Sequence, residues 1–149
     1  MYVHDLSEFR GTLPGSGGAF VFKEDRFTPY VEDTTGEHIG YLAWQGDHPV
    51  GFALVHGLLE DPRRMGHFFV VRGARRTGAG RDLALDVIGR HPRPWQIAFQ
   101  EENPGAARFW RGVAGRAFGD DWVEELRPVP DKPELPPDVW IIADRQPDT

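Results

Sequence analysis

The sequence HFFVVRGARRTGAGR, residues 67–81, joins an apolar run to paired arginines and two closely spaced glycines, just before a helical pattern begins. The run from Phe68 to Val71 has the aromatic and β-branched content of a buried strand, whereas residues 82–88 carry apolar side chains at helical spacing. Gly78 and Gly80 therefore fall at a turn from strand to helix. Such a turn can direct backbone N–H groups at an anion, and the positive end of the helix dipole adds to the attraction.

A pyrophosphate is the anion that this turn favours, because Arg75, Arg76 and Arg81 supply positive charge around the glycines. Two common phosphate loops do not fit. A P-loop needs lysine and then serine or threonine after its second glycine, but an arginine and an aspartate follow Gly80. A dinucleotide fingerprint needs a third glycine at position 83, where this chain has leucine.

The remaining pattern, Arg75-x-x-Gly78-x-Gly80, resembles the acetyl-CoA pyrophosphate loop of the GNAT superfamily of N-acetyltransferases. A second segment, NPGAARFW at residues 103–110, is similar to the Asn-x-x-Ala-x-x-Phe-Tyr signature that opens the next helix in those enzymes. Between the two segments, prolines at 92 and 94 end the first helix and residues 95–99 predict a strand. This order of strand, loop, helix, strand and helix is the core order of the superfamily. Within the superfamily, the chain most resembles a small bacterial subgroup.

The flanking segments complete the expected α/β fold, a single domain over residues 1–149 with a mixed, mostly antiparallel central sheet and flanking helices. Residues 38–45 and 49–56 predict a hairpin, and residues 122–128 and 139–143 predict two further strands. The first strand of the family has no clear counterpart, since only residues 15–23 offer one before the hairpin. A missing edge strand leaves backbone groups unpaired, which makes a homodimer an option.

Composition and charge exclude several classes of function. The 149 residues contain no cysteine, and no apolar run reaches the length of a membrane span. No signal peptide and no metal-ligand spacing such as HExxH is present, so we expect a cytoplasmic protein without a metal. The net charge is −6, but residues 1–62, 63–116 and 117–149 carry −7, +7 and −6. A positive centre in an acidic chain with only two lysines favours a polyanionic cofactor over nucleic acid.

The resemblance implies that acetyl-CoA is the cosubstrate and that three parts of the chain hold it. The backbone of Val70 and Val71 would bind the pantetheine arm, and Asn103 would contact the cofactor while also capping its helix. The pyrophosphate would lie on the loop made of Arg75, Arg76, Thr77, Gly78, Ala79, Gly80 and Arg81.

The catalytic positions of the family are changed in this chain. His67 stands where many members have a glutamate base, and an imidazole can accept a proton near neutral pH. His67 could equally be only a hydrogen-bonded residue of the strand. Trp110 stands where the family has a tyrosine acid, so it could at most donate a hydrogen bond or pack in the core. Protonation of the CoA thiolate would then come from solvent or from Tyr30 or Tyr41.

The acceptor is expected to be a primary amine of a small molecule or peptide, acetylated by direct transfer in a ternary complex. Asp5 and Glu8, one helical turn apart, and Glu32 are the carboxylates that would attract it, although acidic surface residues often serve only solubility. The changes at His67 and Trp110 also allow a catalytically silent acyl-CoA-binding or partner-binding module. A protein that sequesters an antibiotic without modifying it is a third option.

Overall fold

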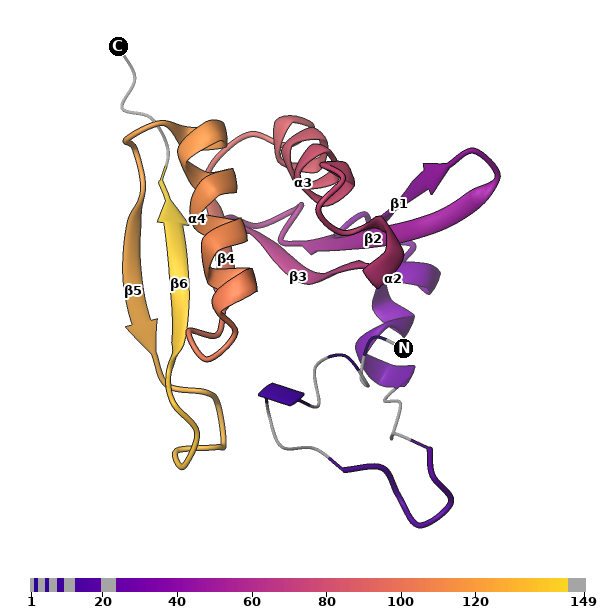
Figure 1. The fold of residues 1–149 in the computed structure, drawn as a ribbon. Coiled ribbons are helices and arrows are strands. Elements are labelled where there is room, and N and C mark those ends of the chain that lie inside the picture. Colours follow the sequence, from indigo (N-terminus) through magenta and orange to yellow (C-terminus); the bar gives the residue numbers. More distant parts are fainter. Residues whose placement is uncertain (1, 3–4, 6–7, 10–12, 20–23, 145–149) are drawn as a thin grey trace.

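The computed structural model describes residues 2, 5, 8, 9, 13–19 and 24–144, and in it six strands form one sheet in the order β1-β2-β3-β4-β6-β5 (Figure 1). The strands are β1 (His38–Gln45), β2 (His48–His56), β3 (Arg63–Val70), β4 (Trp95–Phe99), β5 (Val123–Arg127) and β6 (Asp138–Ala143). All neighbouring strands are antiparallel except β3 and β4, which are parallel. The expected mixed, mostly antiparallel sheet is confirmed.

Helices α3 (Ala79–Gly89) and α4 (Pro104–Phe118) pack on one face of the sheet. The short helices η1 (Glu24–Arg26) and α2 (Thr28–Glu32) lie against the opposite face of β1 and β2, while η2 (Arg72–Ala74) follows β3 directly. In the described part of the chain, two long helices cover one face of the sheet and shorter elements cover the other.

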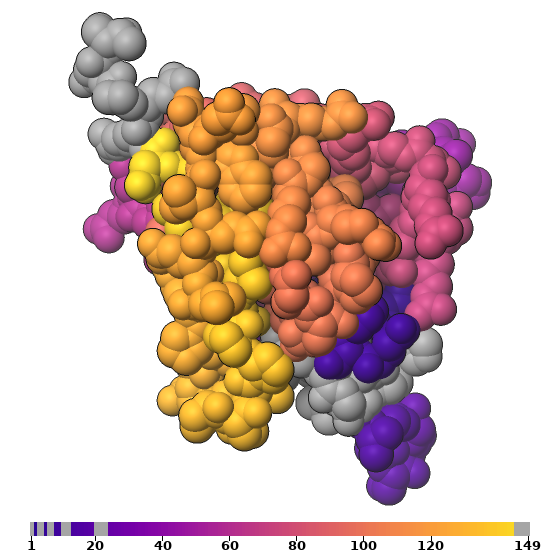
Figure 2. All heavy atoms as spheres, turned by 60° about the vertical axis from the view of Figure 1, so that its left-hand side comes forward, coloured from indigo at the N-terminus to yellow at the C-terminus, as the bar shows by residue number. Residues whose placement is uncertain are grey.

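The core lies between the sheet and the two long helices. In β4, Trp95, Ile97 and Phe99 are buried and alternate with less buried residues, as expected for a central strand. They meet Val113 and Ala114 of α4, both almost fully buried. On the outer side, Arg111 of α4 forms an ion pair with Glu124 of β5, and the two elements lie side by side (Figure 2).

Strands β3 and β4 pair over only three residues and then diverge. The last pair joins Met65 to Ile97, although β3 continues to Val70 and β4 to Phe99. At the same level the register between β2 and β3 shifts by one residue: Leu54 pairs with His67, whereas Val55 pairs with Met65. The residue left over is Gly66, which forms a bulge where the strands part.

The hairpin, the strands after residues 94, 122 and 137, and both long helices occur where the sequence predicts them. No strand precedes His38 among the residues that the structure describes, so β1 is an edge of the sheet. The described part of the expected strand at 15–23, residues 15–19, has no strand pairing, and residues 20–23 lie outside the described range. None of the described helices is long and apolar enough to cross a membrane.

Candidate functional site

The glycine loop forms the turn into α3 that the sequence predicts. Gly78 is the N-cap residue and has a φ of 92°, a conformation that side chains with a Cβ rarely adopt. The N–H of Asp82 makes the first backbone bond of the helix, to the Gly78 carbonyl at 2.9 Å. The N–H groups of Gly80 and Arg81 precede that bond and have no partner within the helix. Together with the helix dipole, they make this turn suitable for an anion.

Gly80 lets the start of α3 approach the end of β3 closely. A Cβ at this position would lie 3.3 Å from Cγ2 of Val70 and 3.5 Å from Cε2 of Phe109. The loop is therefore packed against β3 on one side and α4 on the other, and a larger residue would push it away from both.

The backbone of β3 beside the loop has two different sides. The N–H of Val71 donates to the Val50 carbonyl at 2.9 Å, so it is committed to β2. Since antiparallel pairing alternates along the strand, Phe68 and Val70 direct their backbone groups away from β2, to the side where β4 diverges. Of the two residues expected to hold the pantetheine arm, Val70 has this orientation and Val71 has its N–H engaged elsewhere.

Arg75 and Asp5, expected at opposite ends of the site, form an ion pair. Nη2 of Arg75 lies 2.7 Å from Oδ2 of Asp5, and Nε of Arg72 lies 3.5 Å from the other carboxylate oxygen. Arg75 Nε also donates to the Val70 carbonyl at 2.8 Å. Asp5 is 9% exposed. Asp5, which we expected to offer a carboxylate to the acceptor, is thus paired with two arginines of the cofactor loop region.

The other two loop arginines differ from Arg75. Arg81 lies 3.2 Å from its exposed neighbour Asp82, an ion pair that solvent screens. Arg76 has a φ of 61° and, among the described residues, no acidic partner. Thr77 accepts from the N–H of Ala79 at 3.4 Å and donates to the backbone at 2.7 Å, which holds the loop in shape.

His67 lies on the sheet face that η1 and α2 partly cover. Its Nδ1 is 3.1 Å from the hydroxyl of Tyr2, and its ring stacks on Phe27 with 4.8 Å between centroids. Burial, followed by the charges of Arg26 and His56, lowers the pKa of His67 below 6.5. The imidazole is therefore mainly neutral at neutral pH, and among the described residues only its Nδ1 has a hydrogen-bond partner.

A second histidine–tyrosine pair, which the sequence did not indicate as a unit, stands beside the first. The Tyr30 hydroxyl lies 2.9 Å from Nδ1 of His56, directly over the bulge, where a Cβ at Gly66 would collide with it. Burial raises the pKa of Tyr30 and lowers that of His56. Tyr41, the other tyrosine considered, instead bonds His91 at 2.7 Å and belongs to the helix-covered face. Only the register of β2 and β3, with its bulge, could have shown His56 beside His67.

The remaining expected residues have simpler environments. Trp110 is 6% exposed and packs edge-to-face on Phe68, with ring centroids 4.9 Å apart, so it is a core residue. Asn103 caps α4 by accepting from the Ala106 N–H at 3.1 Å, as expected. Glu8 and Glu32 are exposed. Within the described part of the chain, no group of three or more histidines and carboxylates could hold a metal.

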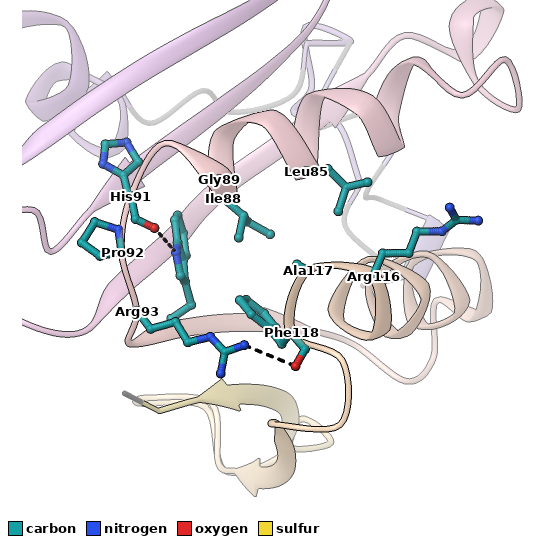
Figure 3. Close-up of a pocket in the computed structure, with 10 residues that line it drawn as sticks. Leu85, Ile88, Gly89, His91, Pro92, Arg93, Arg116, Ala117 and Phe118 are labelled. Atoms are coloured by element: carbon teal, nitrogen blue, oxygen red, sulfur yellow. Dashed lines mark hydrogen bonds between the residues drawn. The ribbon is translucent and has the colours of Figure 1, made fainter. Parts of the chain in front are cut away.

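A hollow of about 370 Å³ lies at the far end of α3, between its last turn and the last turn of α4 (Figure 3). Its polar groups bond to nearby carbonyls: Trp95 donates to the His91 carbonyl at 3.2 Å and Arg93 to the Phe118 carbonyl at 3.3 Å. Since the glycine loop is at the other end of α3, this hollow is not part of the candidate site.

Comparisons with known proteins agree with this architecture. No protein-family model and no curated protein matches the chain in sequence. Among solved structures, a Bacillus subtilis acetyltransferase in complex with CoA has a TM-score of 0.62 at 13% identity, covering 83% of this chain and 85% of its own. The Escherichia coli ribosomal-protein-S18-alanine N-acetyltransferase has a TM-score of 0.61 at 15% identity, covering 88% and 83%.

A third similar structure is a provisionally assigned streptothricin acetyltransferase from Bacillus anthracis, in complex with acetyl coenzyme A. Its TM-score is 0.56 at 18% identity. The match covers 76% of this chain, and this chain spans 65% of the length of the Bacillus anthracis protein. A further similar structure is assigned to the GNAT family. At these identities the likeness concerns the fold alone.

Proposed function

From the GNAT acetyltransferase fold of this chain, we propose that the protein transfers an acetyl group from acetyl-CoA to a primary amine of a small molecule or peptide. The observation that carries the proposal is one juxtaposition. A glycine turn with open N–H groups lies beside the point where β3 and β4 diverge, and His67 and Tyr30 stand at the same point on the other face.

The residues present fit acetyl-CoA. The pyrophosphate would accept from the N–H groups of Gly80 and Arg81 and pair with Arg76, and a Cβ at Gly80 would make a tight contact of 3.3 Å with Val70. Where β4 is absent, the pantetheine arm would pair with the backbone of Phe68 and with the N–H of Val70, whose carbonyl accepts from Arg75. When bound, acetyl-CoA supplies an acetyl group activated as a thioester.

His67 is proposed to take the proton from the amine. If its Nδ1–H donates to the Tyr2 oxygen, Nε2 carries the lone pair and faces the acceptor. A base must be deprotonated before reaction, and the lowered pKa of His67 meets this requirement at neutral pH. Tyr2 is a positioning residue in this scheme, since it fixes the tautomer and the ring.

Tyr30 is proposed to protonate the leaving thiolate. Its raised pKa keeps the hydroxyl protonated, and it stands at the bulge where β3 parts from β4. During transfer the C–N bond forms and the C–S bond breaks. One amine proton passes to His67, and the Tyr30 proton goes to sulfur. Tyr30 recovers a proton from solvent by way of His56, its hydrogen-bond partner.

Isothermal titration with acetyl-CoA, with adenosine as the control ligand, tests the cofactor half of the proposal. Saturable binding that requires the pyrophosphate and pantetheine supports it. Mass spectrometry of an amine panel then tests transfer, since each product gains one acetyl group. Binding of acetyl-CoA without acetylation of any amine would favour the silent binding module, and absence of binding would contradict both functions.

A further inference from the structure

The arginines without an acidic partner are unevenly distributed. Most described arginines form an ion pair: Arg63, Arg72, Arg75, Arg81, Arg90, Arg93, Arg111 and Arg127. Five in the described part of the chain have none, namely Arg26, Arg64, Arg76, Arg108 and Arg116. Arg26, Arg76, Arg108 and Arg116 are exposed and can be solvated, whereas Arg64 is half-buried, so a bound anion would matter most for Arg64. Two of the five, Arg26 and Arg64, lie near His56 and His67.

Arg64 is the more constrained of these two. It pairs with His56 across to β2 and with Gln96 across to β4, so the three side chains share the sheet face that α3 and α4 do not cover. Its guanidinium carbon lies 6.0 Å from the ring centre of Trp140. Nε of Arg64 is buried and makes no hydrogen bond. A buried charged donor without an acceptor costs free energy, and this guanidinium has no carboxylate partner to offset that cost.

Carboxylates near this face are already engaged. Glu37 accepts from the backbone N–H groups of Gly57 and Leu59, and Asp33 accepts from the N–H of His38. The carboxylate of Asp5 forms an ion pair with Arg75. These carboxylates stay ionised, but Arg64 acts on His56 and Arg26 acts on His67. A carboxylate on the acceptor would therefore find a cation beside each of the two histidines.

We propose that the acceptor is an amine that also carries a carboxylate, as an amino acid does, and that Arg64 binds this carboxylate and thereby selects the substrate. The inference rests on the proposed acetyl transfer and gives it a substrate class. A carboxylate would pair with the terminal nitrogens of Arg64, because its Nε is buried. The amine of the same molecule would extend along β3 toward Gly66 and His67, and Arg26 would add long-range attraction.

Matched trios of amines test this inference. Each trio holds an amino acid, its amide and its decarboxylated amine, so that only the carboxylate changes. Initial rates of CoA release should give the amino acid a kcat/KM about 10- to 100-fold above its two partners, as for a charge-assisted pair at a partly buried site. In Arg64→Met, which keeps an apolar stem against Trp140, this advantage of the amino acid over its two partners should disappear. Arg64→Lys should restore part of it.

Arg127→Met is the matched control, because Arg127 also lies over Trp140 but is paired with Glu125. It should keep the preference of the parent. Equal or faster acetylation of the decarboxylated amines by the parent would overturn the inference and leave acetyl transfer intact. If no amine is acetylated, the imidazole NMR signals of His56 and His67 are followed during titration with each trio. Carboxylate-dependent shifts that vanish in Arg64→Met would support the inference without transfer, and their absence would overturn it.

Discussion

The carboxylate of Asp5 lies 2.7 Å from the guanidinium of Arg75, which joins the start of the chain to the segment between β3 and α3. Arg75 in turn holds the carbonyl of Val70, the last residue of β3. The arginine that opens the cofactor signature is thus a structural link between the N-terminal helical residues and the strand end. It shapes the loop, which leaves Arg76 and the backbone N–H groups as the proposed partners of the cofactor phosphates.

Asp5→Ala should lower the free energy of unfolding by about 1–2 kcal/mol, because it removes the buried carboxylate that pairs with Arg75 and Arg72. Asp86→Ala is the matched control, since Asp86 pairs with Arg90 at 2.9 Å with both side chains more than half exposed. That variant should change stability by no more than about 0.5 kcal/mol. Urea unfolding of the two variants measures the difference, and equal losses would contradict a structural role for Asp5.

Gly78→Asp should weaken acetyl-CoA binding at least about tenfold. It places a carboxylate at the anion turn and forces a side chain into a φ of 92°, with its Cβ 3.2 Å from Arg81 Nη2. Gly89→Asp adds the same side chain at the other end of α3, where a Cβ meets nothing within 4 Å. Calorimetric titration compares them. Undiminished affinity in Gly78→Asp would remove the pyrophosphate from this loop.

His67→Gln should reduce turnover by about 10²- to 10⁴-fold, the usual contribution of a general base, while the Kd for acetyl-CoA stays nearly constant. Glutamine can keep the hydrogen bond to Tyr2 but cannot accept the proton. His91→Gln is the control, because His91 bonds Tyr41 on the helix-covered face. Steady-state rates with one amine that the parent acetylates measure the effect. Turnover equal to that of the parent in His67→Gln would exclude His67 as the general base.

Tyr30→Phe should slow transfer from acetyl-CoA, by about tenfold or more, because the leaving thiolate loses its proton donor. Tyr41→Phe removes an equivalent hydroxyl, also bonded to a histidine, and should leave the rate unchanged. The contrast distinguishes a local role of Tyr30 from a general loss of stability. Equal rates in both variants would assign thiolate protonation to solvent.

Stability should fall as the solution is acidified from about pH 7.5 to about pH 5.5. Burial lowers the folded-state pKa values of His56, His67 and His91 below 6.5, so the unfolded chain binds protons more readily. Their contribution is fully present above pH 6.5 and is lost as the pH falls through and below that value. Urea midpoints across this range measure the slope, which His67→Gln should flatten. A slope unchanged by that variant would mean that His67 titrates alike in both states.

The fold followed from the sequence wherever a local pattern decides an element. Asn103 predicts its helix start through the side-chain cap, and the alternation in β4 predicts Trp95 as buried. The site depended on contacts between distant segments. Neither the pairing of Asp5 with Arg75 nor that of His56 with Tyr30 has a local signal, because each joins residues from separate elements.

The bulge explains the largest difference between the expected and the observed site. Without the bulge, His67 and its neighbours would continue a regular ladder with β2. The Tyr30 hydroxyl would then have no open space beside β3. One extra residue, Gly66, opens the space that the Tyr30 hydroxyl occupies. A glycine within a strand is compatible with such a bulge but does not identify which partner fills it.

The three residue pairs that join β3 to β4 are also the seam between two halves of the molecule, β1–β3 and β4–β6–β5. A ligand that paired with the free backbone of β3 beyond Met65 would lengthen this seam as an additional strand does. Cofactor binding would then slow amide hydrogen exchange on both sides of the seam and make the halves unfold as one cooperative unit.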